Sequence, residues 1–267
     1  MKLDLTADEI LVLPPVARPV AHPYSDAPDE GITAHCYAFE EVFGEKIRAL
    51  GERSRPRDLY DVINLFRNGE FHAASEVVRD LVRQKCTFKN ICFPSFEKLE
   101  TFRNELNAEW ANMLRHQLPS LPPVESFWEA LPEFFGWLIG TIVPAVVASY
   151  PLDAGEEVLR LPAGAFRALG RSTPFIEVIR FAATNRLCLD LDYVNEKGTR
   201  ATRTIEPYSL RRTQEGNVLL HAVRWQNQQH RSYRVDRIQG ARVTQQTFTP
   251  RYAVELMPTG PLSVPLR

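Results

Sequence analysis

The sequence predicts an α+β protein whose first half is mainly helical and whose second half is a small β structure. Two observations carry this prediction. The spacing of hydrophobic residues changes from a helical period to an alternating one near residue 173. The charge balance changes in the same region, since residues 173–252 contain 12 Arg and one Lys against four Glu and three Asp. The net charge is therefore +6 in that region and −7 in the remainder, although the total is only −1.

The composition is that of a soluble globular protein. The chain has 267 residues, of which 44% are hydrophobic and 24% charged, so it can bury a sizeable core without disulfides. Its four cysteines fit no close-spaced ligand pattern, so we expect reduced thiols in a cytoplasmic protein and no metal site. The N-terminal "MKLDLTADEILVLPP" contains acidic residues and no long apolar run, so we expect no signal peptide.

One segment is apolar enough to raise the question of a membrane span. Residues 134–150 carry no charge, but Gly136, Gly140 and Pro144 interrupt them. A spanning helix needs about 20 apolar residues. We therefore expect a buried helix end that runs into a linker, and no membrane contact.

The helical half is expected to begin after a short β region. Residues 1–38 are short apolar runs broken by prolines, which predict one or two strands with turns. Residues 39–145 have mostly helical spacing, including one helix over 97–118. A further helix follows "LPP", with Pro132 as a break. We expect a helical domain at 1–145 and a linker at 146–172.

The second half begins with a short helix opened by Pro174. Five strand-like runs follow: "LCLDLDYV", "TRATRTIEPYSLRR", "NVLLHAVRW", "RSYRVDRI" and "ARVTQQTF". Turn signals such as "NEKGT", "QEGN" and "NQQH" separate them. Short strands at this spacing predict a small barrel or rolled sheet at 173–252, followed by a tail at 253–267.

The stretch "FGEKIRALGERSRPRDLYDVINLF" contains the first candidate site. On a helix, an apolar stripe is formed by Phe39, Val42, Phe43, Ile47 and Leu50. Lys46 occupies the one slot of this stripe that is not apolar. Burying an unpaired ammonium is costly, so Lys46 must extend to solvent, pair with a carboxylate or face a cleft.

Pro56 is expected to open a second helix, on which Asp58 and Asp61 flank the apolar stripe. A structural role explains these charges as well as a functional one does. Asp58 in a first helical turn gains from the helix dipole, and Arg57 can pair with Asp61 four residues later on a solvated surface. Periodicity alone leaves both interpretations open.

"EEVFGEKIRALGERSRPRDLYDV" resembles a motif of the AbiEii/AbiGii family of nucleotidyltransferase toxins. The resemblance extends over roughly residues 1–140 through "LDLTADEILVLPP", "HPYSDAP" and "FKNICFPSFEKLETFRNELNAEWANML". It implies that the helical half is part of a DNA polymerase β-like nucleotidyltransferase. Members of this family transfer nucleotides, in known cases to tRNA acceptor ends, and are partnered with antitoxins in phage defence.

The resemblance assigns roles to four residues. Lys46 would contact nucleotide phosphate, Asp58 would be the later catalytic or orienting carboxylate, and Arg57 and Asp61 would support them. The family also has a Gly-Ser loop for the triphosphate and two aspartates for Mg²⁺. Only 45 residues precede Lys46, and they contain neither feature. We expect a catalytically incomplete chain without its own cofactor, to which Mg²⁺ and a nucleoside triphosphate would bind once a missing N-terminal half is supplied.

A carboxylate pair does occur later in the chain, in "LCLDLDY". Asp190 and Asp192 fall on one face of the expected strand, but they follow Lys46 whereas the family's pair precedes it. Carboxylates two residues apart on an exposed strand face are ordinary. We therefore do not assign a metal site there.

The arginine-rich strands contain the second candidate site. In "RSYRVDRI", strand alternation places Arg231 and Tyr233 on one face and Arg234 and Asp236 on the other. Arginines gathered on a small sheet favour contacts with phosphate, carboxylate or nucleic acid. A salt-bridged surface is an equal alternative, with acidic partners at Asp190, Asp192 and Glu206.

The succession "IRFAATNRLCLDLDY", "IEPYSLRRT" and "RSYRVDRI" resembles the WYL domain, an SH3-like (Sm-like) β-barrel of bacterial regulators and defence proteins. The resemblance implies sensing of nucleotides or nucleic acid and oligomerisation. It assigns a ligand pocket to Tyr193, Arg203, His221, Arg231 and Arg234, with core packing an equal alternative for His221. Val218, Leu219 and Leu220 replace Trp-Tyr-Leu, so base stacking is in doubt and arginine contacts are the main attraction.

The sequence thus supports two functional hypotheses. The first is a phage-defence, toxin–antitoxin-type protein with a partial, tRNA-directed nucleotidyltransferase and a WYL ligand sensor. The alternative is a non-catalytic WYL regulator that binds nucleotides or nucleic acid. The candidate partners are nucleotide or nucleic acid, tRNA, an antitoxin and a second copy of the chain. A stand-alone transcription factor ranks third, since no helix-turn-helix signal is present.

Overall fold

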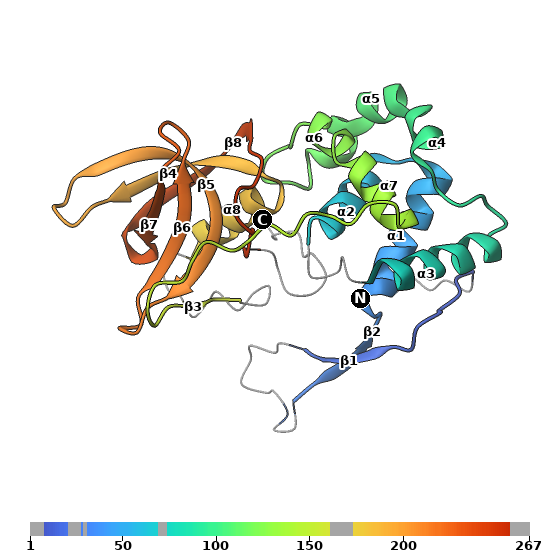
Figure 1. Cartoon of the computed structure of the whole chain (residues 1–267), viewed down its shortest axis with the longest axis horizontal. Coiled ribbons are helices and arrows are strands. Elements are labelled where there is room, and N and C mark those ends of the chain that lie inside the picture. The colour runs from blue at the N-terminus through green and yellow to red at the C-terminus, as the bar shows by residue number, and fades with distance from the viewer. Residues whose placement is uncertain (1–7, 21–27, 29–30, 69–73, 161–172, 257–267) are drawn as a thin grey trace.

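The computed structural model of the chain describes residues 8–20, 28, 31–68, 74–160 and 173–256 (Figure 1). Helices gather in the N-terminal half, and an antiparallel sheet forms the C-terminal half (Figure 1). This arrangement confirms the predicted α+β class.

The N-terminal region forms a small hairpin ahead of the helices. Strand β1 (Val16–Pro19) pairs antiparallel with β2 (Thr33–Cys36), and Val16 lies opposite Cys36. The prediction of one or two strands in this region is confirmed.

Helices α1 (Phe39–Arg53) and α2 (Pro56–Phe66) contain the first candidate site. Helix α1 ends because Ser54 adopts the left-handed conformation at φ 46°, and its amide donates to the carbonyl of Leu50. Pro56 begins α2, as predicted, because a first-turn residue needs no amide hydrogen. The apolar stripes of both helices face the core.

Five further helices complete this half: α3 (Ser75–Phe88), α4 (Phe96–Glu100), α5 (Arg103–Leu114), α6 (Glu125–Trp128) and α7 (Leu131–Ile139). The single helix predicted over 97–118 is wrong, because the chain turns between α4 and α5. The Thr101 hydroxyl donates to the carbonyl of Lys98 at 2.7 Å and competes with the helical pattern there. Pro132 lies in the first turn of α7, so the helix begins at this point.

The uncharged segment 134–150 is a helix end followed by extended chain, as predicted. Phe134 and Leu138 are buried, and α7 stops at Gly140, where φ is 82°. A Cβ on Gly136 would lie 2.3 Å from Ile142 Cδ1, so glycine lets the chain fold back over the helix. Among the described residues, no helix is long and apolar enough to cross a membrane.

The C-terminal half consists of α8 (Thr173–Thr184) and an antiparallel sheet. The strands are β3 (Glu157–Val158), β4 (Leu187–Val194), β5 (Arg200–Arg212), β6 (Val218–Arg224), β7 (His230–Arg234) and β8 (Ile238–Thr247). Their order is β7-β6-β5-β4-β8, with β3 on β5, and the 3-10 turn Val235–Arg237 links β7 to β8. The predicted strands are confirmed, except that "RSYRVDRI" is a strand only as far as Arg234 and continues as this 3-10 turn. Barrel closure stays a prediction, since the described pairings do not join β7 to β8.

Part of the expected linker belongs to the sheet. Glu157 pairs with Arg212 and Val158 with Arg211, so β3 extends the sheet along β5. Residues 161–172 of the linker and 257–267 of the tail lie outside the described residues. The proposed domain boundaries therefore remain predictions.

The two halves pack against each other through a continuous apolar core. The buried side chain of Asn64, on α2, donates from Nδ2 to Oδ1 of Asn185, which follows α8, at 3.4 Å. Gln245 of β8 also donates to the hydroxyl of Ser120 at 3.0 Å. Residues about 120 positions apart in the chain therefore meet at this junction.

Candidate nucleotide-binding site

Lys46 and Asp61 form the exposed part of the first candidate site. The Nζ atom of Lys46, on α1, lies 2.6 Å from Oδ2 of Asp61, on α2. The two side chains are 38% and 33% exposed. Of the three predicted outcomes for a lysine in this stripe, pairing with a carboxylate is the one found. Burial raises the pKa of Asp61, whereas its hydrogen bond with Lys46 lowers it.

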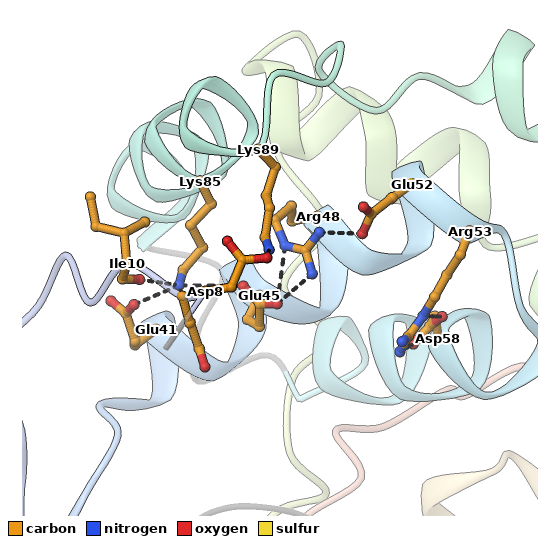
Figure 2. A network of polar contacts seen from close by, with 11 residues as sticks. Asp8, Ile10, Glu41, Glu45, Arg48, Glu52, Arg53, Asp58, Lys85 and Lys89 are labelled. Carbon is orange, nitrogen blue, oxygen red and sulfur yellow. Dashed lines mark hydrogen bonds and ion pairs between the residues drawn. The ribbon is translucent and has the colours of Figure 1, made fainter. Parts of the chain in front are cut away.

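Asp58 lies one turn before Asp61 and has a different environment. Its side chain is buried, and both of its oxygens accept hydrogen bonds from Arg53, at 2.7 Å from Nε and 2.8 Å from Nη2 (Figure 2). This bidentate pair joins the last turn of α1 to the first turn of α2. The hydrogen bond with Asp58 raises the pKa of Arg53.

Arg57 is exposed and donates from Nε to the carbonyl of Met113 at 3.4 Å. Its positive charge lowers the pKa of Asp61, so it lies within electrostatic range of that carboxylate. The direct ion pair of Asp61, however, is with Lys46. Of the four residues predicted here, the structure therefore brings Lys46 and Asp61 into contact, while Asp58 and Arg57 have other partners.

A buried ion pair beside this site was not predicted. The Nζ atom of Lys85, on α3, lies 2.7 Å from Oε1 of Glu41, on α1, and both side chains are 1% exposed. Lys85 also donates to the carbonyl of Ile10 at 2.9 Å (Figure 2). Glu41 accepts hydrogen bonds from the amides of Val12 and Leu13. The pair thus attaches the N-terminal segment to α1 and α3.

A second ionic cluster on α1 is centred on Arg48, whose side chain is buried. Arg48 lies between Glu45 and Glu52 and bonds to both carboxylates (Figure 2). Its hydrogen bond with Glu45 raises the pKa of Arg48. These contacts, three and four residues apart, are those expected on a helix face. Arg48 is therefore a structural residue of α1.

Tyr193 and Arg234, which the WYL resemblance assigned to a ligand pocket, lie together. The Tyr193 hydroxyl accepts a hydrogen bond from the backbone amide of Arg234 at 3.3 Å, and its ring packs edge-on against Tyr233. The guanidinium of Arg234 donates to both oxygens of Asp236, at 3.1 and 2.7 Å. Arg234 is thus already paired with a carboxylate.

Arg203 and Arg231 have only neutral partners among the described residues. Arg203 donates to the carbonyl of Thr202 at 3.0 Å, and Arg231 donates to the side chain of Gln229 at 2.8 Å. Neither is within 4.0 Å of a described carboxylate. The structure does not bring either of them into contact with Tyr193 or Arg234.

Asp190 and Asp192 form a salt-bridged surface on one face of β4. Asp190 accepts from Thr204 at 2.8 Å and from Arg242 at 3.0 Å, and Asp192 accepts from Thr202 and Arg200. Their oxygens are used by neighbouring side chains, as the structural alternative predicted. Over the described ranges, no group of three or more metal-binding side chains is present.

His221 lies in a buried polar cluster that sequence reasoning did not predict. Its Nδ1 is 3.2 Å from Nε2 of His230, and its Nε2 is 3.5 Å from Oε1 of Glu156. Burial lowers the pKa of His221 to about 4. The Tyr150 ring stacks on His230 at 3.5 Å between centroids. His221 therefore has a structural environment inside the sheet half.

Arg211 is the fully buried cation of the same cluster. It donates to the carbonyls of Tyr150 and Pro151 at 2.6 and 2.7 Å and to the Ser209 hydroxyl at 3.1 Å. Its Nη1 lies 3.4 Å from Glu156. Arg211 thus holds the segment that precedes β3 against β5.

Known protein families match both the helical half and the sheet half of the chain. The family described as nucleotidyl transferase AbiEii toxin, type IV TA system, matches residues 1–133. The WYL domain family matches residues 174–243. No curated protein matches the chain.

Among solved structures, one similarity is to the proteasome accessory factor B/C (PafBC) of Arthrobacter aurescens. The identity is 14% and the TM-score is 0.29, over 38% of this chain and 16% of that chain. A TM-score this low does not establish a shared fold.

Proposed function

Since residues 1–133 are an AbiEii nucleotidyltransferase toxin domain and residues 174–243 are a WYL domain, we propose that the chain acts in a toxin–antitoxin-type defence system. In this proposal the helical half binds a nucleoside triphosphate, and the WYL half binds nucleotides or nucleic acid. The tRNA acceptor end is the proposed target of transfer, and an antitoxin is the proposed partner.

The state of Lys46 is the observation that carries this proposal. Its ammonium is 38% exposed and is paired with one half-buried carboxylate. A partly exposed ion pair of this kind contributes about 0–1 kcal/mol, so a triphosphate with several negative charges can compete for the lysine. This exposure supports a phosphate-binding role for Lys46, in which Asp61 holds the ammonium in position.

Asp58 supports a more limited role. A carboxylate that acts on a substrate needs an accessible oxygen, whereas both oxygens of Asp58 are bonded to Arg53 and the side chain is 1% exposed. We assign Asp58 an orienting role between α1 and α2. We further propose that this chain, acting alone, binds nucleotide without completing transfer.

The alternative function, a non-catalytic WYL regulator, is favoured by the state of the sheet arginines. Arg203 and Arg231 contact only neutral groups among the described residues and belong to a region of net charge +6. Phosphate oxygens can replace such neutral acceptors and form stronger, charge-assisted bonds. In this alternative, nucleic acid binding by the sheet half is the principal activity.

Transfer and binding measured side by side test the proposal. The purified chain is incubated with Mg²⁺, tRNA and each of the four labelled nucleoside triphosphates, and triphosphate affinity is measured separately. We expect binding without label transfer. Label transfer that is lost in Lys46→Ala or Asp58→Ala would contradict the binding-only role, and absence of triphosphate binding would contradict the proposed function of the helical half.

A further inference from the structure

A cavity of about 720 Å³ lies where the helical half meets the sheet half. Its walls come from the end of α2, the region from α6 to the start of α7, the segments 144–149 and 247–255, and the single residues Arg160 and Arg186. In Figure 1 the chain that leaves α7 runs across this junction towards the sheet. The volume falls within the range of about 300–1,000 Å³ that is usual for small-molecule sites.

Arg67, the residue that follows α2, lines the cavity from the helical half. Its Nη2 donates to the carbonyl of Ser126 at 2.8 Å, and its guanidinium lies 4.8 Å from the centre of the Phe127 ring. Its Nη1 is buried and has no hydrogen-bond partner among the described residues. An unbonded buried donor on a charged group is costly, so an acceptor at this position would be stabilising.

Arg186 lines the cavity from the sheet half, in the turn between α8 and β4. Its backbone has φ 55°, a conformation that is uncommon for residues other than glycine. Its guanidinium donates to the carbonyls of Ala183 at 3.3 Å and Arg67 at 3.4 Å, both long contacts. Within the described residues, neither Arg186 nor Arg67 has a carboxylate within 4.0 Å.

Within the part of the chain that the structure describes, the two guanidiniums therefore have no ion-pair partner. Burial lowers the pKa of Arg67 to about 10 and that of Arg186 to about 9, and the charge of Arg67 contributes to the second shift. Both arginines are still charged at neutral pH. Both residues keep some exposure on the cavity wall. Charges largely withdrawn from water without an opposite charge are still rare in folded proteins, because the desolvation cost is not recovered.

The carboxylates on the cavity wall do not fill this role. Glu129 and Glu133 are exposed, so water weakens their effect. The charge of Glu129 opposes the lowering of the Arg67 pKa, but it does not outweigh the effect of burial. Glu255 accepts a hydrogen bond from the Ser149 hydroxyl at 2.8 Å and lies 3.8 Å from Arg211. The described carboxylates on the wall thus leave the guanidiniums of Arg67 and Arg186 without a direct ion pair.

We propose that this cavity binds a nucleoside monophosphate, with its phosphate between Arg67 and Arg186. A guanidinium matches the spacing of phosphate oxygens and forms two bonds to them. The base would lie against the apolar wall formed by Phe66, Phe248 and Pro144. This site is separate from Lys46 and from the predicted WYL ligand residues.

The position of the site gives the ligand a second effect. Arg67 belongs to the helical half and Arg186 to the sheet half, so one phosphate would hold the two halves together. A ligand that binds only the docked arrangement stabilises it by mass action. Ligand binding in the cavity would thereby stabilise the docked arrangement of the two halves.

Calorimetric titration of the full chain carrying Lys46→Ala tests this proposal, because that substitution removes the helical phosphate site. The probes are AMP, GMP, CMP and UMP, with the four corresponding nucleosides as phosphate-free controls. We expect at least one monophosphate to bind more tightly than its nucleoside. Its affinity should fall at least roughly tenfold in Arg67→Gln and in Arg186→Gln, since each loses a charge-assisted contact. Arg242→Gln, which removes an exposed arginine of β8, should leave the affinity unchanged.

Ala253→Trp provides a variant that keeps both arginines. Ala253 lines the cavity, so the larger side chain should fill it and abolish monophosphate binding. If an arginine variant does not fold, this variant still tests whether the cavity is the binding site. The proposal is overturned if no monophosphate binds, if the nucleosides bind equally well, if binding survives in Ala253→Trp, or if the affinity is unchanged in either folded arginine variant. Loss of triphosphate binding on Lys46→Ala is the separate result that concerns the helical site.

Discussion

Asp61 forms a 2.6 Å ion pair with Lys46, whereas Asp58, one turn earlier on the same helix, is buried against Arg53. The two carboxylates therefore differ in what they can do. The partly exposed pair can open to a competing anion, while the buried pair fixes the packing of α1 on α2. This difference separates the binding residue from the structural one within a single motif.

Arg53→Ala should lower the free energy of unfolding by about 2–3 kcal/mol, because it leaves the buried carboxylate of Asp58 without its bidentate partner. Urea unfolding followed by circular dichroism measures this change. Arg83→Ala is the matched control, since Arg83 pairs with Asp80 where both side chains are more than 60% exposed. The control should change the stability by less than about 0.5 kcal/mol. Equal effects of the two substitutions would contradict the structural role of Asp58.

Lys85→Met should release the N-terminal segment, because the buried Glu41 would lose its counter-ion and Ile10 its donor. The expected loss of stability is about 3 kcal/mol. Hydrogen exchange at the amides of Val12 and Leu13, which donate to Glu41, should become faster. Lys89→Met is the control, since its partner Asp8 is 80% exposed. Unchanged exchange in Lys85→Met would show that this pair does not hold the segment.

The cluster of His221 and His230 should make the protein less stable in mild acid. Burial lowers the pKa of His221 to about 4 and also lowers that of His230, so the unfolded chain binds more protons between about pH 4 and 6.5. The stabilising effect of keeping His221 neutral is complete above about pH 6.5 and is lost as the pH falls towards 4. Glu156 lies near the His221 ring and favours its protonation, whereas Arg211 and His230 oppose it.

Unfolding by urea at several pH values between 4 and 8 measures this dependence. Other groups also titrate in the range, so the quantity of interest is the difference between the wild type and His221→Gln. The variant should lose less stability than the wild type between pH 6.5 and 4. Parallel curves for the two proteins would rule out His221 as the titrating group.

Arg231→Ala combined with Arg234→Ala should weaken the binding of short single-stranded oligonucleotides and reduce the salt dependence of that binding. The logarithm of the affinity falls as the logarithm of the salt concentration rises. Each lost phosphate contact makes this fall less steep, by about 0.7 in the slope. The matched control is the double variant of Arg200 and Arg242, exposed arginines that pair with Asp192 and Asp190. If the control weakens binding as much as the test variant, the assignment of the WYL ligand residues is wrong.

The sequence predicted the elements well because their signals are local. Alternation located the strands of the sheet half, and Pro56 located the start of α2. The position of Lys46 in an apolar stripe limited this residue to three outcomes, of which pairing with a carboxylate, Asp61, is the one found. The break between α4 and α5 was missed because a threonine side chain, and no glycine or proline, turns the chain there.

The buried polar residues could not be predicted, because their partners are distant in the sequence. In the sequence, Lys85 is an ordinary cation in the last turn of a helix. Its partners Glu41 and Ile10 come close to it only in the folded chain. The junction cavity is a further example, since Arg67 and Arg186 lie in separate halves. Periodicity reports which face of an element is buried, but not which charged groups meet there.

The most direct test of the account is the affinity of the full chain for nucleoside triphosphates with Mg²⁺. We predict binding of at least one triphosphate, weakened at least roughly tenfold by Lys46→Ala through loss of a charge-assisted phosphate contact. Lys197→Ala, which removes an exposed lysine between β4 and β5, should leave the affinity unchanged. Equal affinities in the wild type and Lys46→Ala would contradict the assignment of Lys46 as the phosphate-binding residue of this chain.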